Sequence, residues 1–208
     1  MKSQSNFSKK SRASNNKGKG ITGEIRIIGG QWRGRKLKVH DKEGLRPTTD
    51  RLKETVFNWL MMDIRDANVL DCFAGAGSLS FEAASRGASQ VTCIEKDKQA
   101  AKQLSQNVST LNAQSQITVL QGDFFEQIKH LVNVYDLVFI DPPFYKGMID
   151  KALLSLIDCG AITAGTIVYI EQESSNHFDL LTSELSSKFQ LTKEKKAGQV
   201  LAQIYTYV

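Results

Sequence analysis

The sequence has little proline, few cysteines and no long hydrophobic run. Three prolines and three cysteines stand among 208 residues. No stretch approaches the roughly 18 uninterrupted apolar residues of a membrane helix, so no segment is predicted to span a bilayer. With 41% hydrophobic and 24% charged residues, the composition is that of a globular domain with a sizeable core.

The cysteines are odd in number and lack CxxC spacing, which argues against disulfides and against a zinc site. Cys72, Cys93 and Cys159 each lie in an apolar segment, as expected for small core residues in a reducing cytosol. The three histidines are scattered without ligand spacing. We therefore expect no metal, no membrane contact and a cytoplasmic location.

Basic residues are concentrated near the amino terminus. Residues 1–40 hold 11 Lys or Arg and one acid, Glu24, which leaves 16 basic and 21 acidic residues for the rest. Residues 1–20 carry no acid and almost no bulky apolar side chain, so burial cannot offset the entropy of ordering them. They are predicted to form a disordered basic tail, which either binds an acidic partner or is only solvated.

Two short β-prone runs, EIRII and KLKV, flank a turn that contains glycine and predict a β-hairpin within residues 21–45. Trp32, Arg33, Arg35 and Lys36 fall near its tip. An exposed aromatic ring among guanidinium groups suits RNA, because bases stack on the ring and phosphates accept Arg hydrogen bonds. The alternative is that Trp32 folds back over a small core.

The remainder, residues 46–208, is predicted to be one α/β domain. RPTTDRLKETVFNWL, residues 46–60, has helix-start residues followed by apolar side chains at helical spacing. Strand-like segments then alternate with amphipathic ones, and the strands are expected at residues 67–73, 90–95, 116–121, 135–140, 166–172, 189–196 and 199–208. This order predicts a seven-stranded, mostly parallel sheet with helices on both faces and an antiparallel edge hairpin at the carboxyl end.

Ligands of such sheets bind at the carboxyl ends of the strands, and the loop DCFAGAGS lies at the first of these ends. Gly75 and Gly77 let the backbone approach a ligand closely, ahead of a helix amino terminus. Ser80 stands where the dinucleotide fingerprint has its third glycine, which argues against a cofactor with a pyrophosphate.

Two further strand ends carry acids. Glu95 ends the second strand, where a carboxylate is placed to bind the two hydroxyls of a ribose. Asp123 follows the third strand and is placed to accept a hydrogen bond from an adenine amino group, while Phe124 covers the ring. A turn glycine, a capping acid and a core phenylalanine are the ordinary alternatives, but their order at successive strand ends favours a ligand that contains a nucleoside.

These motifs, together with DPPF at residues 141–144, resemble the ordered motifs of class I S-adenosylmethionine-dependent methyltransferases. Within that class, RIIGGQWRGRKL followed by RPTTDRLKETVFNWL is similar to the bacterial 16S rRNA guanine-N(2)-methyltransferase family called RsmD. The resemblance covers residues 24–208 and implies the Rossmann-like class I methyltransferase fold. The family often has Tyr where this chain has Phe144.

The resemblance implies methyl transfer from S-adenosylmethionine to the 2-amino nitrogen of a guanine in 16S rRNA, within the small ribosomal subunit. The residues assigned to the cofactor are Asp71, Phe73, Ala74, Gly75, Gly77, Glu95, Lys96, Asp123, Phe124 and Asp141. Arg46, Thr49 and Arg51 join the four hairpin-tip residues as the predicted RNA contacts. We expect the chain to act as a monomer.

Two of the three prolines stand side by side in DPPF, directly after the apolar run YDLVFI. An exocyclic amine is a poor nucleophile because its lone pair is delocalised into the ring. Asp141 and the carbonyl of Pro142 are placed to accept the two amino hydrogens, so that the lone pair is directed at the methyl donor. Pro142 and Pro143 keep the loop extended, and Phe144 stacks on the target base. The alternative is a strand terminator with a helix-capping Asp.

Two other functions remain open at this point. DPPF-like motifs serve any exocyclic amine, so a DNA adenine-N(6) or cytosine-N(4) methyltransferase is the first alternative. Such enzymes usually carry an additional domain that reads the DNA sequence, whereas this chain has only a small basic hairpin. A non-catalytic RNA-binding assembly factor is the second alternative, and the intact DPPF argues against it.

Overall fold

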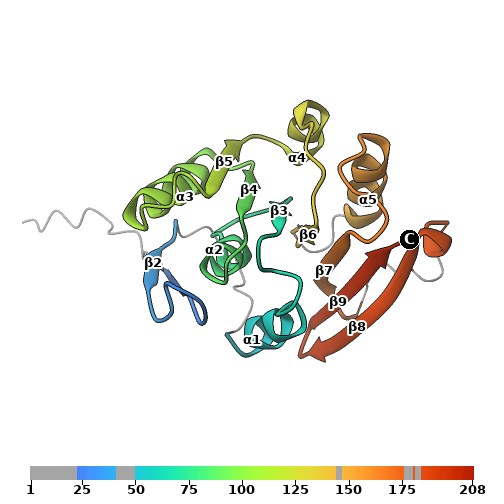
Figure 1. Cartoon of the computed structure of the whole chain (residues 1–208), viewed down its shortest axis with the longest axis horizontal. Coiled ribbons are helices and arrows are strands. Elements are labelled where there is room, and N and C mark those ends of the chain that lie inside the picture. Colours follow the sequence, from blue (N-terminus) through green and yellow to red (C-terminus); the bar gives the residue numbers. More distant parts are fainter. Residues whose placement is uncertain (1–22, 41–49, 144–146, 176–179, 181–183) are drawn as a thin grey trace, which may run out of the picture.

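The computed structural model describes residues 23–40, 50–143, 147–175, 180 and 184–208 (Figure 1). Its strands are β1 (Glu24–Arg26), β2 (Lys36–Lys38), β3 (Asn68–Asp71), β4 (Gln90–Glu95), β5 (Ile117–Gln121), β6 (Leu137–Ile140), β7 (Ile167–Glu173), β8 (Phe189–Ala197) and β9 (Val200–Tyr207). Its helices are α1 (Asp50–Trp59), α2 (Ser78–Ser85), α3 (Lys98–Thr110), α4 (Phe124–Gln127) and α5 (Ile149–Asp158), with single 3₁₀ turns η1 (Ile128–His130) and η3 (Ser186–Lys188).

Seven strands form one sheet in the order β5-β4-β3-β6-β7-β9-β8. The first five of these are parallel, and β9 runs antiparallel to both β7 and β8. The predicted mostly parallel sheet with an antiparallel terminal hairpin is therefore confirmed. The strand order reverses between β3 and β6, so the loops that follow these two strands meet at one edge of the sheet.

Helices cover both faces of this sheet (Figure 1). Helices α1, α2 and α3 contribute buried apolar side chains to one hydrophobic cluster, whereas α4 and α5 contribute to a second cluster on the opposite face. Helix α1 is amphipathic: Leu52, Val56 and Phe57 are buried while Arg51 and Glu54 are exposed. Helix α2, in contrast, is buried along nearly its whole length. None of the helices in the described ranges is long and apolar enough to cross a membrane.

The predicted amino-terminal hairpin is present as β1 and β2, which pair antiparallel. Its apolar side is not separate from the main domain, because Ile25, Ile27 and Leu37 are buried in the same cluster as α1, α2 and α3. Trp32 is half-buried and packs against this cluster, so the structure favours the alternative in which this ring covers a core. The predicted tail, residues 1–20, lies outside the described residues.

A buried ion pair attaches the hairpin to the helices. Glu82 of α2 is fully buried, and its Oε2 accepts from the backbone N–H of Ile28 at 2.8 Å, while its Oε1 accepts from Arg86 Nε at 2.7 Å. Lys53 of α1 is also buried; its Nζ lies 3.9 Å from Glu82 Oε2 and donates to the Arg26 carbonyl at 2.5 Å. Burial lowers the pKa of the Lys53 amine, and the charge of Glu82 acts against that shift.

The glycine pair of RIIGGQWRGR lies directly on α2. The Ser85 carbonyl accepts from the Gln31 N–H at 2.8 Å, and Ser85 Oγ accepts from the Trp32 N–H at 2.9 Å and donates to the Gly29 carbonyl at 2.6 Å. Gly30 has a φ of +72°, and a Cβ at this position would lie 1.8 Å from the Ser85 carbonyl oxygen. Only glycine fits between this turn and the helix.

The cysteine prediction is wrong for one residue. Cys72 and Cys93 are buried, but Cys159 is exposed. Helix α5 ends at Asp158, so Cys159 caps the helix at the surface although the surrounding sequence is apolar. Apolar composition did not show where the helix ends.

Two glycines in the hairpin give a matched test of this packing. Gly34 also has a positive φ, +86°, but a Cβ there would meet nothing within 4 Å. Gly34→Ala should therefore lower the free energy of unfolding only by the backbone strain, about 1 to 2 kcal/mol. Gly30→Ala should cost about 1 to 3 kcal/mol more because of the overlap with Ser85. Urea unfolding measures both, and equal losses of stability would show that the turn does not bear on α2.

Candidate active site

The strand ends bring the predicted site residues to one edge of the sheet. Asp71, at the end of β3, is in register with Cys93 of β4 and Phe139 of β6. Glu95 ends β4, and Asp141 directly follows β6. The acids predicted from separate motifs therefore lie on neighbouring strands at the switch point of the sheet.

The glycine loop connects β3 to α2 through two residues with positive φ, Gly75 at +53° and Gly77 at +80°. A Cβ on Gly77 would lie 2.5 Å from Leu104 Cδ2 and 2.6 Å from Phe81 Cε2. At Gly77 the close approach is therefore between the loop and helices α2 and α3, and a side chain here would meet the protein interior. In the same loop Phe73 is half-buried and Ala74 is buried.

Glu95 holds the glycine loop in place. Its Oε2 accepts from the Gly75 N–H at 2.8 Å, and its Oε1 accepts from the Asp97 N–H at 2.6 Å. The Glu95 backbone carbonyl accepts from the Gly122 N–H at 2.9 Å, which ties the loop after β5 to the same strand end. A carboxylate has about four acceptor positions, so both oxygens can also accept from ligand hydroxyls.

Asp123 caps helix α4, with Oδ1 accepting from the Phe125 N–H at 3.0 Å. Its Oδ2 accepts from Lys96 Nζ at 2.8 Å, and this hydrogen bond is the main cause of a lowered Asp123 pKa. The Lys96–Asp123 pair joins the loops that follow β4 and β5. Lys96 and Asp123, which were both assigned to the cofactor, are therefore in contact.

The aromatic ring at the surface of this loop is not the one expected. Phe124 is 2% exposed and packs in the core, with its ring centroid 5.2 Å from that of Phe73 and 5.2 Å from that of Phe125. Phe125 is half-buried and reaches the surface. Because Phe124 and Phe125 are adjacent, the sequence does not indicate which of the two rings faces inward.

Asp71 is buried beneath the glycine loop at 2% exposure. Its Oδ2 accepts from Ser80 Oγ at 2.5 Å, so the residue that replaces the third fingerprint glycine positions this carboxylate. Its Oδ1 is buried and makes no hydrogen bond of good geometry. Burial raises the pKa of Asp71 to about 6, and the hydroxyl of Ser80 moderates the rise. An unsatisfied buried acceptor beside the loop fits a ligand that brings a donor, such as the ammonium group of S-adenosylmethionine.

Asp141 is half-buried, Pro142 is buried and Pro143 is exposed, whereas Phe144 lies outside the described residues. Burial raises the pKa of Asp141 well above its usual range, and the carboxylates of Glu171 and then Asp71 add to the rise. Glu171 was not predicted from the sequence. In the part of the chain that the structure describes, no group of three or more His, Cys, Asp or Glu residues is arranged to hold a metal ion.

The hairpin and α1 enclose a polar hollow of about 290 Å³. Its lining residues are Arg26, Ile27, Ile28, Arg33, Gly34, Asp50, Arg51 and Glu54. It thus brings together Arg33 and Arg51, two predicted RNA contacts far apart in sequence, and adds Arg26, which the sequence did not single out.

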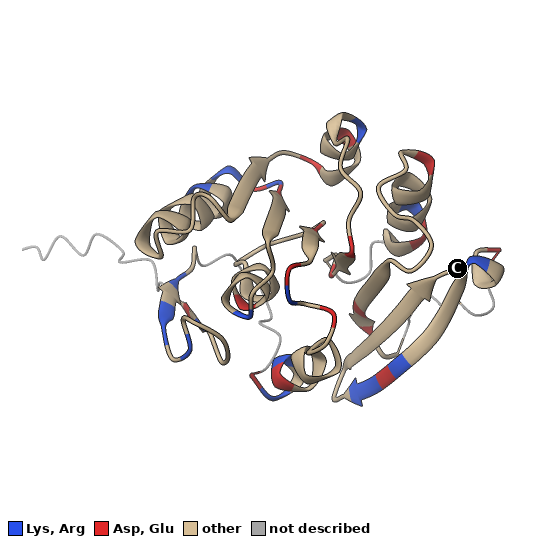
Figure 2. Cartoon of the chain, viewed as in Figure 1, with Lys and Arg blue, Asp and Glu red and all other residues tan. Residues whose placement is uncertain are grey.

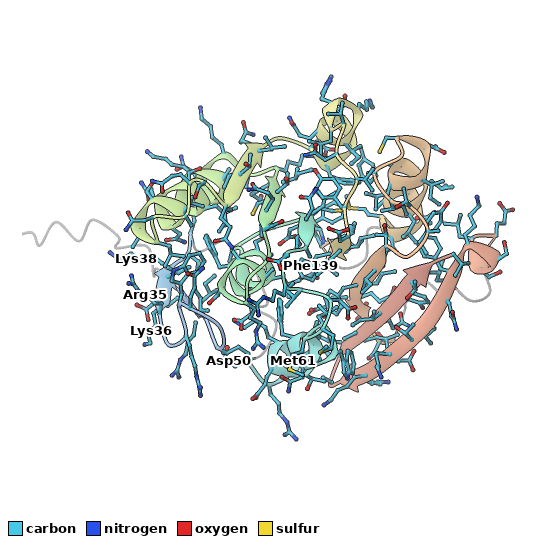
Figure 3. All side chains as sticks on the ribbon, in the orientation of Figure 1. Arg35, Lys36, Lys38, Asp50, Met61 and Phe139 are labelled. Atoms are coloured by element: carbon cyan, nitrogen blue, oxygen red, sulfur yellow. The ribbon has the colours of Figure 1, made fainter. Side chains whose placement is uncertain are left out.

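Trp32, Arg35 and Lys36, also predicted RNA contacts, lie on the hairpin but do not line this hollow. Figure 3 shows Arg35 and Lys36 on the hairpin, and both side chains are exposed. Lys36 forms an ion pair with Glu24 at 3.2 Å. In Figure 2 several segments of the hairpin ribbon carry the blue of Lys and Arg. Arg46 and Thr49 fall in residues 41–49, whose structure is not described.

Comparison with known proteins identifies relatives over most of the chain. A family model described as Conserved hypothetical protein 95 matches residues 25–206. Ribosomal RNA small subunit methyltransferase D of Escherichia coli K12 is 44% identical over 184 residues, which cover 88% of this chain and 90% of the relative. The protein of the same name from Haemophilus influenzae is 44% identical over 187 residues, which cover 88% of this chain and 94% of the relative.

A solved structure agrees with these matches. The solved structure of a candidate methyltransferase from Escherichia coli superimposes on this chain with a TM-score of 0.79 at 40% identity. The match covers 89% of this chain and 98% of that chain. The family match, residues 25–206, includes nearly all of the described fold, the hairpin among it.

The buried Asp71 carboxylate should lower stability at neutral pH. Folding raises its pKa from 3.8 to about 6, so its ionised form is penalised in the folded state. The penalty is absent below about pH 4, grows between pH 4 and 6, and is complete above pH 6. Asp71→Asn keeps an acceptor for Ser80 and should raise the free energy of unfolding by about 2 to 3 kcal/mol at pH 7, with no gain near pH 4.

Denaturant unfolding of both proteins across pH 4 to 8 tests this difference. The exposed Asp158→Asn variant is the control and should follow the wild type at every pH. A stability gain for Asp71→Asn that does not change with pH would contradict the assignment of a raised pKa.

Proposed function

The chain belongs to the Conserved hypothetical protein 95, or RsmD, family of methyltransferases, and from this membership we propose that it methylates the 2-amino nitrogen of a guanine in 16S rRNA. The substrate is the small ribosomal subunit, and the enzyme acts as a cytoplasmic monomer. The observation that carries the proposal is the convergence of Asp71, Glu95 and Asp141 at one sheet edge, where cofactor and target amine have to meet.

The cofactor is S-adenosylmethionine, which supplies a methyl group activated by a positively charged sulfur. Glu95 binds the ribose hydroxyls while its oxygens continue to hold the glycine loop. Asp71 Oδ1, which makes no hydrogen bond of good geometry within the protein, accepts from the ammonium group. Asp123 accepts from the adenine amino group, and Phe125 covers the exposed side of the ring.

Asp141 and the Pro142 carbonyl act on the target base. They accept the two hydrogens of the exocyclic amine and hold its nitrogen towards a tetrahedral geometry, which directs the lone pair away from the ring. The two prolines fix the loop so that the carbonyl is presented without further ordering. Phe144 is assigned to stacking on the base, on the strength of the sequence alone.

The polar hollow between the hairpin and α1 is the proposed RNA contact. Arg26, Arg33 and Arg51 line it, and guanidinium groups donate in pairs to phosphate oxygens. Asp50 and Glu54 line it as well. Arg35 and Lys36 extend the same basic surface along the hairpin. The acids at the sheet edge do not line the hollow, so the hollow is proposed to bind RNA next to the target nucleotide.

Asp141→Ala should separate cofactor binding from catalysis. The variant removes one of two acceptors for the amino hydrogens, so methyl transfer should fall by about a hundredfold or more. Affinity for S-adenosylmethionine should change little because Gly75 and Glu95 are untouched. The exposed Asp158→Ala variant should behave as wild type in both measurements.

The assay is labelled methyl transfer to small ribosomal subunits that lack the modification, followed by nucleoside analysis and by calorimetry with S-adenosylmethionine. N(2)-methylguanosine is the expected product. Appearance of N(6)-methyladenosine would overturn the proposed substrate, and full activity of Asp141→Ala would overturn the proposed catalytic role.

Charge reversal in the hollow should weaken RNA binding without affecting the cofactor. Arg33→Glu and Arg51→Glu should each lower affinity for the ribosomal substrate and reduce the slope of log affinity against log salt by about 1. Lys151→Glu, on α5 at the opposite side of the molecule (Figure 1), makes the same change of charge as a control. If all three variants lose affinity equally, the effect is one of net charge and the hollow is not the contact.

A further inference from the structure

The register of the sheet places a second carboxylate beside Asp141. Ile140 of β6 pairs with Ile170 of β7, and the next residue on each strand is an acid, Asp141 and Glu171. Adjacent strands lie about 4.8 Å apart, and residues opposite each other in a parallel pair project to the same face. The two carboxyl groups are therefore neighbours on one face of the sheet.

Glu171 is held firmly in this position. It is 3% exposed, and its Oε2 accepts from the hydroxyl of Tyr169 at 2.7 Å. Tyr169 is itself fully buried, with its ring centroid 5.9 Å from that of Phe139. The carboxylate therefore sits in a region of low dielectric, where charge interactions with its neighbours are strong.

The charged groups that face Asp141 from the described strands are both acids, Glu171 from β7 and Asp71 from β3. Tyr145 and Lys146 follow in the chain and lie outside the described residues. Two carboxylates this close in a buried setting resist simultaneous ionisation, so the neighbour makes Asp141 hold a proton more tightly. Of the two causes, Glu171 acts more strongly on Asp141 than Asp71 does.

We propose that Glu171 is a positioning residue for methyl transfer, whose charge beside Asp141 makes the Asp141 carboxylate the strong acceptor that the target amine requires. This inference rests on the proposed function. A more basic carboxylate accepts a stronger hydrogen bond and leaves more electron density on the amine nitrogen.

The step balances with the groups already named. The amine nitrogen forms a bond to the methyl carbon as the bond from that carbon to sulfur breaks, and the sulfur keeps the electron pair. The methylated nitrogen then carries a positive charge and releases one proton. That proton passes to the Asp141 carboxylate, which later returns it to solvent. Glu171 touches no reacting atom and acts through Asp141.

Glu171→Gln tests the proposal because it removes the charge and keeps the shape and an acceptor for Tyr169. We expect the acidic limb of the kcat profile to move to lower pH by about one pH unit or more. At the alkaline plateau kcat should fall several-fold, because Asp141 has become the weaker acceptor. Glu173→Gln is the matched control: it is a buried acid on the same strand and face but is two residues farther along, and its profile should follow the wild type.

Cofactor affinity and melting temperature are measured on the same proteins. With Glu171→Gln the affinity should not change and the melting temperature should not fall, since the variant removes repulsion between buried acids; this distinguishes an electrostatic role from a loss of structure. An unmoved pH profile overturns the proposal. If the wild type methylates no guanine in small subunits, the proposed function itself is wrong. This outcome is read from the wild type alone, whereas the role of Glu171 is read from the difference between the variants and the wild type.

A second measurement applies if Glu171→Gln does not fold. The side-chain carboxyl carbon of Asp141 is followed by NMR across pH in the wild type, with Asp141→Asn providing the assignment. A titration above the ordinary aspartate range, in two coupled steps with Glu171, supports the proposal. A single step near the ordinary value overturns it.

Discussion

A buried ion pair between Lys53 and Glu82 holds the functional parts of this protein in one arrangement. Lys53 donates to the Arg26 carbonyl in the hairpin and to Ser78 Oγ at 3.3 Å, at the start of α2. Glu82 Oε2 accepts a hydrogen bond from the backbone N–H of Ile28, in the segment that follows β1. The pair therefore connects the proposed RNA contact, α1 and the end of the glycine loop. Removing one partner of such a buried pair costs about 3 to 5 kcal/mol, because the other charge is left uncompensated.

The catalytic edge of the sheet has the opposite electrostatic character. Asp71, Asp141 and Glu171 are acids placed close together, and burial is the main cause of the raised pKa at both Asp71 and Asp141. Repulsion from Glu95 adds to the rise at Asp71, whereas repulsion from Glu171 and Asp71 adds to the rise at Asp141. This arrangement lowers the stability of the folded protein at neutral pH. Carboxylates with raised pKa values at a strand edge are typical of catalytic sites, where proton affinity matters more than stability. The structure thus combines a stabilised attachment of the hairpin with a destabilised reaction centre.

Periodicity in the sequence predicts the fold well, and spatial neighbours are what it misses. Every strand of the sheet coincides with a run of strand-like pattern in the sequence. Gly75, Glu95 and Asp141 are recognisable because each ends or follows such a run. Glu171 carries no local signal, since only the pairing of β6 with β7 brings it to Asp141. The half-buried ring of Phe125 in α4 and the exposed thiol of Cys159 after α5 were not predicted for a related reason: each depends on how a helix turn is oriented, which apolar composition does not specify.

The hairpin shares its hydrophobic core with the domain, and this has a consequence for how a target is chosen. An RNA-binding arm on a flexible linker samples many distances, so it raises the local concentration of substrate without selecting one nucleotide. Here Ile25, Ile27 and Leu37 are buried together with the helices that support the cofactor loop. The distance from the hollow to Asp141 is consequently fixed. Under the proposed function, a rigid span selects the one nucleotide that lies at that distance from the bound stretch of RNA, and the shape of the folded substrate takes the place of a sequence-reading domain.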